Sequence, residues 1–526
     1  MANQSFSAYD DVLYRGGIFP YTHPDNLATL AALHGMKPAR VDSCRVLELG
    51  CGEGANLIPM ASTIPAGRFV GVDLAARPIA AGQASIQALG LTNVTLRQLD
   101  LMELGPAFGE FDYIITHGVY SWVPQAVQDK ILEICRANLA PDGVAYVSYN
   151  TYPGGHLRAM VRDMMRYHVR HLTEPAERVG QARSLVKFLA ESTPEPDVYR
   201  LVLKEELERL TEYPEYLLYH DDLAEINSPV YVHQFLDHAA QHGLQYVTEA
   251  SFLDIQTGVF PAHVTNALRE LAGDVIATEQ YLDFLKCRCF RKTLLCHRAV
   301  ELDRTLTSDK LTAFYVASPV HSTSPYPGIC SRTVEEFRGP KGSAIKSDQP
   351  LIKAAFQYLS EVWPQSPHFG EVLGVARARL DRGSHLEEST EGEDARLLHD
   401  TLLRAYAAGV VELHVHTPPF LLKITARPVA SPLARLQLQS GSMVTTLRHT
   451  SLKVEDALAR QLLLMLDGTR DREALIHDLA GLIAGGVVDF RSGGEPIRDY
   501  RRARQLIQDG LEAKLNEIAR LALLVG

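Results

Sequence analysis

Apolar runs alternate with segments of helical periodicity through the first 150 residues. The apolar runs predict five strands, at residues 44–49, 68–74, 94–100, 111–117 and 144–149. Helical spacing predicts helices at residues 55–62, 79–89 and 128–137. Strands that are apolar almost throughout, with helices between them, are typical of a parallel sheet covered on both faces. The pattern therefore predicts a doubly wound α/β domain, whose ligand lies outside the carboxyl ends of the strands.

Three glycines at alternate positions, Gly50, Gly52 and Gly54, follow the first predicted strand. Glycine tolerates positive φ and lets a ligand approach the backbone. A strand–loop–helix unit of this kind directs backbone N–H groups at the ligand. The spacing is not the Gly-x-Gly-x-x-Gly of dinucleotide sites. Glu48 precedes the loop, and its carboxylate would repel phosphate but suits a cationic or amino-acid ligand.

This combination resembles motif I of the class I S-adenosylmethionine-dependent methyltransferases. The resemblance implies that S-adenosylmethionine is the cofactor and that Glu48 faces its methionine end. The residues that the motif implies for cofactor binding are Glu48, Gly50, Cys51, Gly52, Gly54 and Asn56.

Polar residues also end the following strands, at Asp73, Asp100 and His117. Asp73 lies about 20 residues beyond the glycine loop, where an acidic side chain can accept hydrogen bonds from both ribose hydroxyls, and Leu74 follows it. Asp100 and the backbone near Leu101 would meet the adenine amino group. The alternatives are that Asp73 caps a helix and that Asp100 closes a turn. His117 either packs on the cofactor or closes a turn.

Residues 1–40 form a leader that is rich in aromatic residues and contains a short predicted helix at residues 25–35. Two interpretations stay open. The leader packs on the domain, or it is a lid that covers the bound cofactor. The aromatic residues concerned are Tyr9, Tyr14, Phe19 and Tyr21.

A methyl sulfonium attracts aromatic faces and polar oxygen atoms. The candidates for the acceptor pocket are Tyr14, Tyr120, Asn150 and Tyr152. Tyr120 and Tyr152 fit either the pocket or the core, and we interpret Trp122 as a core residue. No catalytic base is assigned, because methyl transfer to an amine depends more on positioning than on a strong base.

Composition limits the class of protein. A chain of 526 residues suggests about three or four domains. The net charge of -11 and the pI of about 6.0 argue against a nucleic-acid partner. Seven scattered cysteines favour a reducing compartment over a disulfide framework. There is no signal-peptide pattern and no apolar run of about 18 residues. We therefore expect a cytoplasmic protein without membrane insertion.

Several segments resemble one bacterial family, the methyltransferases with a methyltransferase regulatory domain, which includes the rickettsial outer-membrane-protein lysine methyltransferases. The segments are Tyr9-Asp10, Thr22-His23-Pro24, Asn150-Thr-Tyr-Pro-Gly154, His220-Asp221-Asp222-Leu223, Asn227-Ser-Pro-Val-Tyr231 and a block that ends at His297. The catalytic resemblance covers residues 1–172 and the regulatory block residues 215–300. The resemblance implies a Rossmann-like domain, mainly helical accessory domains and a homodimer.

We expect four domains: a cofactor domain with its lid at residues 1–172, a helical regulatory and dimerisation domain at 173–300, a middle domain at 301–440 and a C-terminal helical domain at 441–526. In the middle domain, predicted helices at 354–362, 372–380 and 397–409 precede an alternating stretch. This texture is typical of a winged-helix-like module. Without a basic face, we interpret it as a protein-docking domain.

Two groups of metal-ligand residues are not assigned to a metal. Cys287, Cys289, Cys296 and His297 do not have standard zinc spacing, and the apolar residues around them are typical of a buried helix. His414 and His416 share one face of a predicted strand, which we interpret as solvated. We predict no metal.

The sequence thus favours an S-adenosylmethionine-dependent methyltransferase that acts on protein, most reasonably on lysine. Two alternatives stay open. One is a small-molecule methyltransferase, and the other is a catalytically silent scaffold that binds S-adenosylmethionine. The motifs do not separate a protein acceptor from a small one.

Overall fold

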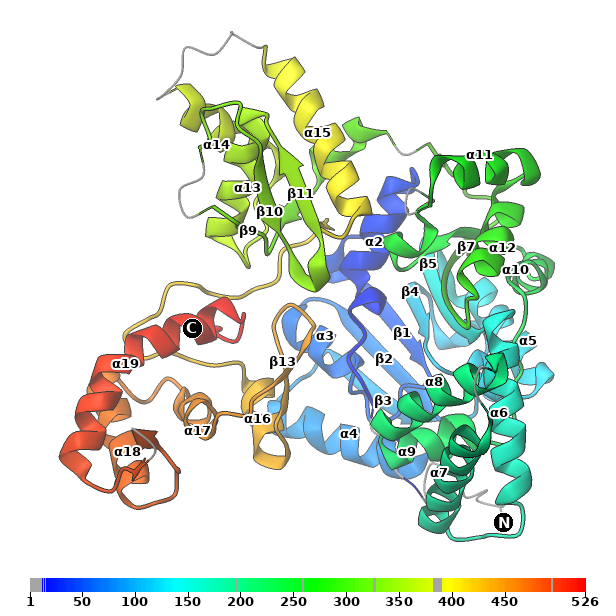
Figure 1. The fold of residues 1–526 in the computed structure, drawn as a ribbon, viewed down its shortest axis with the longest axis horizontal. Helices are drawn as coiled ribbons and strands as arrows, with labels where there is room; N and C mark the ends of the chain where they lie inside the picture. Colours follow the sequence, from blue (N-terminus) through cyan, green and yellow to red (C-terminus); the bar gives the residue numbers. More distant parts are fainter. Residues whose placement is uncertain are drawn as a thin grey trace.

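The computed structural model describes residues 12, 14, 16–194, 197–257, 260–305, 307–324, 328–381, 390–492 and 495–526. Its centre is a seven-stranded sheet in the order β3-β2-β1-β4-β5-β7-β6 (Figure 1). The five parallel strands are β1 (Arg45–Leu49), β2 (Arg68–Asp73), β3 (Val94–Gln98), β4 (Phe111–Thr116) and β5 (Leu139–Asn150). The predicted α/β sheet is confirmed, and the strand order reverses between β1 and β4.

Helices cover both faces of this sheet. Those on one face are α2 (Pro24–Leu33), α3 (Leu57–Thr63) and α4 (Ala76–Leu89), and the other face is covered by α5 (Gln125–Asn138) and α10 (Val232–Gln241). The alternation of side chains along β1 divides the core between them. Val46 packs with Leu57 and Ile79, while Leu47 packs with Ile131 on the opposite side.

Two strands from the regulatory segment complete the sheet. They are β6 (Leu244–Glu249) and β7 (Phe290–His297), and β7 runs antiparallel to both β5 and β6. The prediction of a buried helix around Leu294 and Leu295 was wrong, because both residues lie in β7 with 0% of their surface exposed. A short apolar run buried on both faces has no periodicity that separates a strand from a helix.

Arg291 on β7 is fully buried among three acids. Its Nη1 donates to Glu249 Oε1 at 2.8 Å, and its Nη2 donates to Glu279 Oε2 at 2.9 Å and Asp283 Oδ1 at 2.8 Å. Glu249 ends β6, and the other two acids lie on α12 (Val275–Lys286). Burial raises the pKa of Glu279 and of Asp283, and the guanidinium opposes that shift. One side chain thus joins the sheet to the helix that covers it.

The remaining accessory helices form separate layers (Figure 1). Near the carboxyl ends of the strands lie α6 (Gly154–His168), α7 (Pro175–Ser192), α8 (Val198–Glu212), α9 (Glu215–Leu217) and the π-helical turn η6 (Leu218–Asp222), while α11 (Ala262–Leu271) precedes α12. The first helices share a core of their own that includes Val161, Val186 and Leu210. In the described ranges, no helix is both long and apolar enough to cross a bilayer.

Two more units follow. The middle unit contains β8 (Tyr315–Ala317), β9 (His321–Ser322), β10 (Glu335–Arg338), β11 (Ala344–Ser347), α13 (Pro350–Val362), α14 (Phe369–Asp381), α15 (Glu391–Ala407) and β12 (Glu412–His414). The C-terminal unit contains α16 (Pro432–Ser440), β13 (Met443–Thr445), β14 (Ser451–Lys453), α17 (Ala457–Met465), α18 (Arg472–Ala484), β15 (Arg491–Ser492), β16 (Glu495–Pro496) and α19 (Tyr500–Arg520). In Figure 1 the latter extends to the lower left, with α16 and β13 nearest the sheet domain.

His414 does not belong to a solvated face, as the sequence had suggested. Its Nδ1 lies 2.6 Å from Asp25 Oδ2 at the start of α2, and the Asp25 carboxylate raises the pKa of His414 to about 9 against the opposing effect of burial. The Val415 and His416 backbone N–H groups also donate to Asp25. The middle unit is therefore attached to the helix that follows the leader.

Replacement of Arg291 by methionine should strongly destabilise the protein. The variant leaves Glu249, Glu279 and Asp283 buried without their cation, and breaking a buried ion pair from one side costs about 3–5 kcal/mol. The measurement is the free energy of unfolding in urea. The matched control is Arg269→Ala at an exposed arginine on α11, which should change it by less than about 0.5 kcal/mol. If Arg291→Met unfolds no more easily than the control, the network does not stabilise the sheet.

Candidate active site

A cavity of about 690 Å³ opens along the carboxyl ends of the parallel strands. The cofactor candidates from the sequence that line it are Glu48, Gly50, Cys51, Gly52, Asn56, Asp73, Leu74, Asp100, Leu101 and His117. They come from the loops after β1, β2, β3 and β4, which meet at one edge of the sheet. Gly54 is the cofactor candidate that does not line the cavity.

The glycine loop needs all three glycines, for different reasons. Gly50 has a φ of 74°, and a Cβ there would lie 2.4 Å from Val119 Cγ2. Gly52 has a φ of 53°, and nothing lies within 4 Å of the place a Cβ would take. Gly54 has a φ of 72°, and a Cβ there would press on Leu96 at 2.9 Å. Gly52 therefore leaves space on the cavity side, while Gly54 serves the turn and its packing.

Glu48 is a buried carboxylate with an incomplete set of partners. Its Oε1 accepts a hydrogen bond from Asn56 Nδ2 at 2.9 Å, and its Oε2 has no hydrogen-bond partner among the described residues. Burial, followed by the charge of Asp73, raises the pKa of Glu48 to about 7. A buried acceptor without a partner is costly. It therefore suits a cationic ligand group such as the ammonium of an amino acid.

The Asn56 side chain connects Glu48 to two distant segments. Its Oδ1 accepts from the backbone N–H of Phe19 at 3.1 Å and lies 3.0 Å from His449 Nε2. Its Nδ2 donates to Glu48 and, at 3.0 Å, to Thr22 Oγ1. Burial lowers the pKa of His449 well below its usual range, so the neutral ring donates from Nε2. The leader and the C-terminal unit therefore meet at one amide beside the cavity.

Asp73 and Asp100 hold their loops as well as line the cavity. Asp73 Oδ2 accepts from Gly52 N at 2.8 Å and Oδ1 accepts from Ala75 N at 2.9 Å. Asp100 Oδ1 accepts from Met102 N at 2.9 Å and caps a short 3-10 turn. Asp100 thus closes a turn, as one alternative had it. Asp73 does not cap α4, because the N-cap of that helix is Ala75 and has no side-chain cap. Both residues still face the cavity that the loops enclose.

The described part of the leader lies along the cavity. Tyr14, Gly16, Gly17 and Phe19 line it, and the Phe19 ring packs on His117 with ring centroids 3.8 Å apart. Burial, and then the charge of Lys292, lowers the pKa of His117 to about 3, so the ring is neutral. Tyr9 lies outside the described residues. That this segment moves as a lid stays a prediction.

The structure divides the acceptor-pocket candidates. Tyr14 and Asn150 line the cavity. Tyr120 is in the core against Phe235, with ring centroids 5.1 Å apart. Tyr152 stacks on His156, with ring centroids 3.9 Å apart, and does not line the cavity. Both lie outside the pocket for which they were candidates. Conversely, the prediction of Trp122 as a core residue was wrong, because the cavity is lined by this tryptophan.

The cavity is also lined by residues that no motif had assigned to the site. They come from α6, α8 and the segment after α8, and they are Arg158, Arg162, Arg209, Tyr213, Asp221, Asp222 and Asn227. Asp222 forms an ion pair with Arg209 at 2.7 Å. Burial, and then the charge of Asp222, raises the pKa of Asp221 to about 7. The sequence feature that could have pointed to these residues was the His220-Asp221-Asp222 segment, which was used only as part of the resemblance to the methyltransferase family.

Known families match three parts of the chain. The matches are "Methyltransferase domain" at residues 46–143, "Predicted methyltransferase regulatory domain" at 214–297 and "PKMT, C-terminal winged helix domain" at 426–523. An uncharacterized Rickettsia prowazekii protein is 32% identical over 528 residues, which is 98% of this chain and 93% of that protein. The chain belongs to the S-adenosylmethionine-dependent methyltransferases with a methyltransferase regulatory domain.

Solved structures of this family resemble the whole chain. PKMT2 from Rickettsia typhi has a TM-score of 0.88 at 28% identity, and its complex with AdoHcy (S-adenosylhomocysteine) has a TM-score of 0.87 at 28% identity. Both comparisons cover 98% of this chain and 100% of the other. A second R. prowazekii protein is 37% identical over 233 residues, covering 44% of this methyltransferase and 93% of that protein. The winged-helix match covers residues 426–523 and so lies mostly in the C-terminal unit, whereas the sequence had predicted this fold for residues 301–440.

The affinity for S-adenosylhomocysteine should fall as the pH drops below about 7. In the free protein Glu48 takes up a proton with a pKa of about 7, whereas a bound ammonium favours the carboxylate. Linkage then weakens binding by up to about tenfold per pH unit in that range. Calorimetry between about pH 5.5 and 7.5 measures this slope. A free α-amino group titrates above this pH range, so the ligand's own amine does not contribute to the slope.

Two variants separate Glu48 from other groups. Glu48→Gln should bind weakly with a flat pH profile. Asp221→Asn removes the other carboxyl in the cavity with a pKa of about 7 and should keep the slope. An unchanged slope in Glu48→Gln would mean that another group controls cofactor affinity.

Proposed function

We propose that this methyltransferase modifies lysine side chains of a protein acceptor. The observation that supports the proposal most is the composition of the single cavity. The cofactor candidates line it together with Asp221 and Asp222 from the accessory segment, and Arg158, Arg162 and Arg209 line it too. The feature that suits an amine acceptor is the Asp221 carboxyl, whose pKa of about 7 lets it accept a proton near neutral pH.

At the cofactor end, each residue has a role consistent with its contacts. S-adenosylmethionine would supply an electrophilic methyl group on a cationic sulfonium. Glu48 would bind the ammonium through the Oε2 that has no partner among the described residues. Asp73 would bind the ribose hydroxyls, and Asp100 with the backbone at Leu101 would bind the adenine.

At the acceptor end, Asp221 would remove the proton from the incoming amine. A lysine ammonium has an ordinary pKa of about 10.4 and must become neutral before it can act as a nucleophile. Asp221 has a pKa of about 7, which is the range in which a general base works best. Asp222 pairs with Arg209 beside it at 2.7 Å. Phe19 and Trp122 border the same space, and exclusion of water there would favour the neutral amine.

The relatives support a protein acceptor without deciding it. The two solved rickettsial structures carry the name PKMT2, and the sequence resembles rickettsial lysine methyltransferases. Accessory helices at the acceptor end offer a surface to a large substrate. A small-molecule acceptor is the alternative. The domain boundaries, the homodimer and the cytoplasmic location stay predictions.

Transfer of labelled methyl groups in a cell lysate tests both parts of the proposal. Wild-type protein should label proteins at lysine, with kcat rising as the pH increases through about 7 because Asp221 must be ionised. Asp221→Asn should lower kcat about 10²–10⁴-fold with little change in affinity for S-adenosylhomocysteine. Asp237→Asn, at an exposed aspartate on α10, is the matched control.

The outcomes are distinct. Label that enters only small molecules would overturn the protein acceptor. Wild-type kcat in Asp221→Asn, or an unchanged pH profile, would overturn the role of Asp221 as the base.

A further inference from the structure

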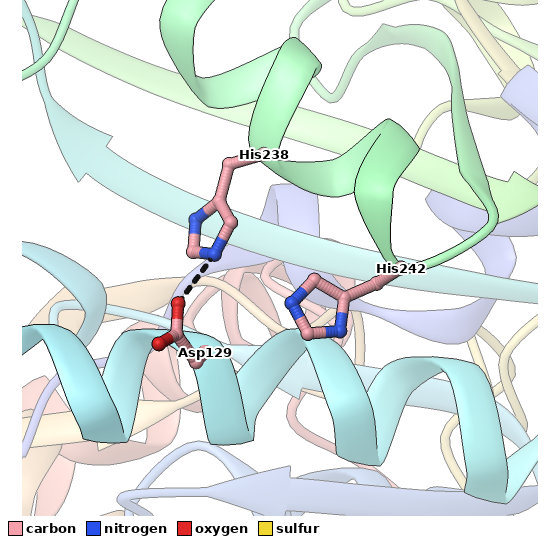
Figure 2. Close-up of side chains that lie close together, drawn as sticks. All are labelled: Asp129, His238 and His242. Atoms are coloured by element: carbon pink, nitrogen blue, oxygen red, sulfur yellow. Dashed lines mark hydrogen bonds and ion pairs between the residues drawn. The ribbon is translucent and has the colours of Figure 1, made fainter.

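Three side chains of metal-ligand type converge outside the cavity, between α5 and α10 (Figure 2). Asp129 comes from α5, while His238 lies on α10 and His242 is the residue that ends it. Their ligand atoms all lie within 4.8 Å of one another. We propose that Asp129, His238 and His242 bind a divalent cation of the Zn²⁺ type.

The spacing and the ligand types suit such an ion. His238 and His242 are four residues apart, which places both rings on one side of the helix, and Figure 2 shows both beside Asp129. Two imidazoles and one carboxylate form a common ligand set for Zn²⁺, with a water molecule in the fourth position. The Nε2 of His238 already lies 2.7 Å from Asp129 Oδ1. A small separation of these two atoms would admit the ion.

A second interaction orients the ring of His238. Its Nδ1 lies 2.8 Å from the hydroxyl group of Tyr120, which is buried. A histidine that binds metal through one nitrogen usually donates the hydrogen of the other to an oxygen atom, and this fixes its tautomer. In the free protein Nε2 of His238 carries the hydrogen that it donates to Asp129. On binding an ion Nε2 would lose that hydrogen, and Nδ1 would donate to the Tyr120 hydroxyl oxygen. An ordinary surface ion pair does not require this buried partner.

The surrounding charges are compatible with a cation. His238 and His242 are half-buried and Asp129 is exposed, so an ion can reach the three side chains from solution. Glu133 lies one turn after Asp129 on α5 and pairs with Lys130 at 3.0 Å. Asp129 would therefore be the anionic ligand of a bound cation.

The ion would connect two domains close to the acceptor pocket. Asp129 belongs to the methyltransferase match and both histidines to the regulatory match. Tyr120 and Trp122 share one short 3-10 turn, and Trp122 lines the cavity. The metal would thus hold α10 against α5 and stabilise the turn that carries Trp122. This role is independent of the identity of the methyl acceptor.

Metal titration of the full-length protein tests the proposal. The wild type is treated with a chelator, dialysed and titrated with Zn²⁺ against a chromophoric competitor, and thermal melts are recorded with and without the ion. Wild type should bind about one Zn²⁺ per chain and melt at a higher temperature with it, because an ion that binds only the folded state stabilises that state. Co²⁺ should give the visible absorption of a tetrahedral site.

The variants His238→Ala, His242→Ala and Asp129→Asn should lose this binding and the thermal shift. His263→Ala, at an exposed histidine on α11, and Asp237→Asn on α10 should keep both. Melts without metal show whether each variant is folded. His238→Ala also loses the hydrogen bond to Tyr120, so if that variant does not fold, His242→Ala decides the outcome, because no hydrogen bond joins His242 to Tyr120. Wild type that binds no Zn²⁺, or variants that bind it as wild type does, would overturn the proposal.

Discussion

A hydrogen-bonded amide at Asn56 is the contact on which the rest of the site depends. A buried carboxylate such as Glu48 is stable only when its oxygens have partners, and Asn56 supplies one of them. The same amide accepts from Phe19 in the leader and from His449 in the C-terminal unit. Two segments distant in sequence therefore set the position of one side chain, and that side chain sets the position of Glu48.

The accessory domains are parts of the catalytic unit. The regulatory segment contributes β6 and β7 to the central sheet, and Arg291 holds them through buried ion pairs. Asn150 at the end of β5 donates to Asn227 Oδ1 at 2.8 Å, and both line the cavity. The cavity is thus built across the boundary between the methyltransferase domain and the regulatory segment. Removal of that segment would remove two strands as well as one wall of the cavity.

The parts that the sequence predicted are those that depend on local patterns. The glycine loop, Asp73 and Asp100 each follow an apolar strand, and parallel strands bring their carboxyl ends to one edge. The remaining features depend on partners that local patterns do not reveal. His414 was interpreted as solvated because its partner Asp25 lies 389 residues away. Tyr120 and Trp122 are separated by one residue, and contacts with Tyr149, Phe235 and His238 from distant parts of the chain place Tyr120 in the core.

Calorimetry of S-adenosylhomocysteine binding to His449→Asn tests whether His449 positions Glu48 through Asn56. His449 has a φ of 55°, which asparagine tolerates, but its shorter side chain would not reach Asn56. Loss of this hydrogen bond, about 1–2 kcal/mol, should weaken binding roughly 5- to 30-fold. The control His477→Asn, at an exposed histidine of the same unit, should bind as wild type does. Wild-type affinity in a folded His449→Asn variant would mean that His449 does not position Glu48 through Asn56.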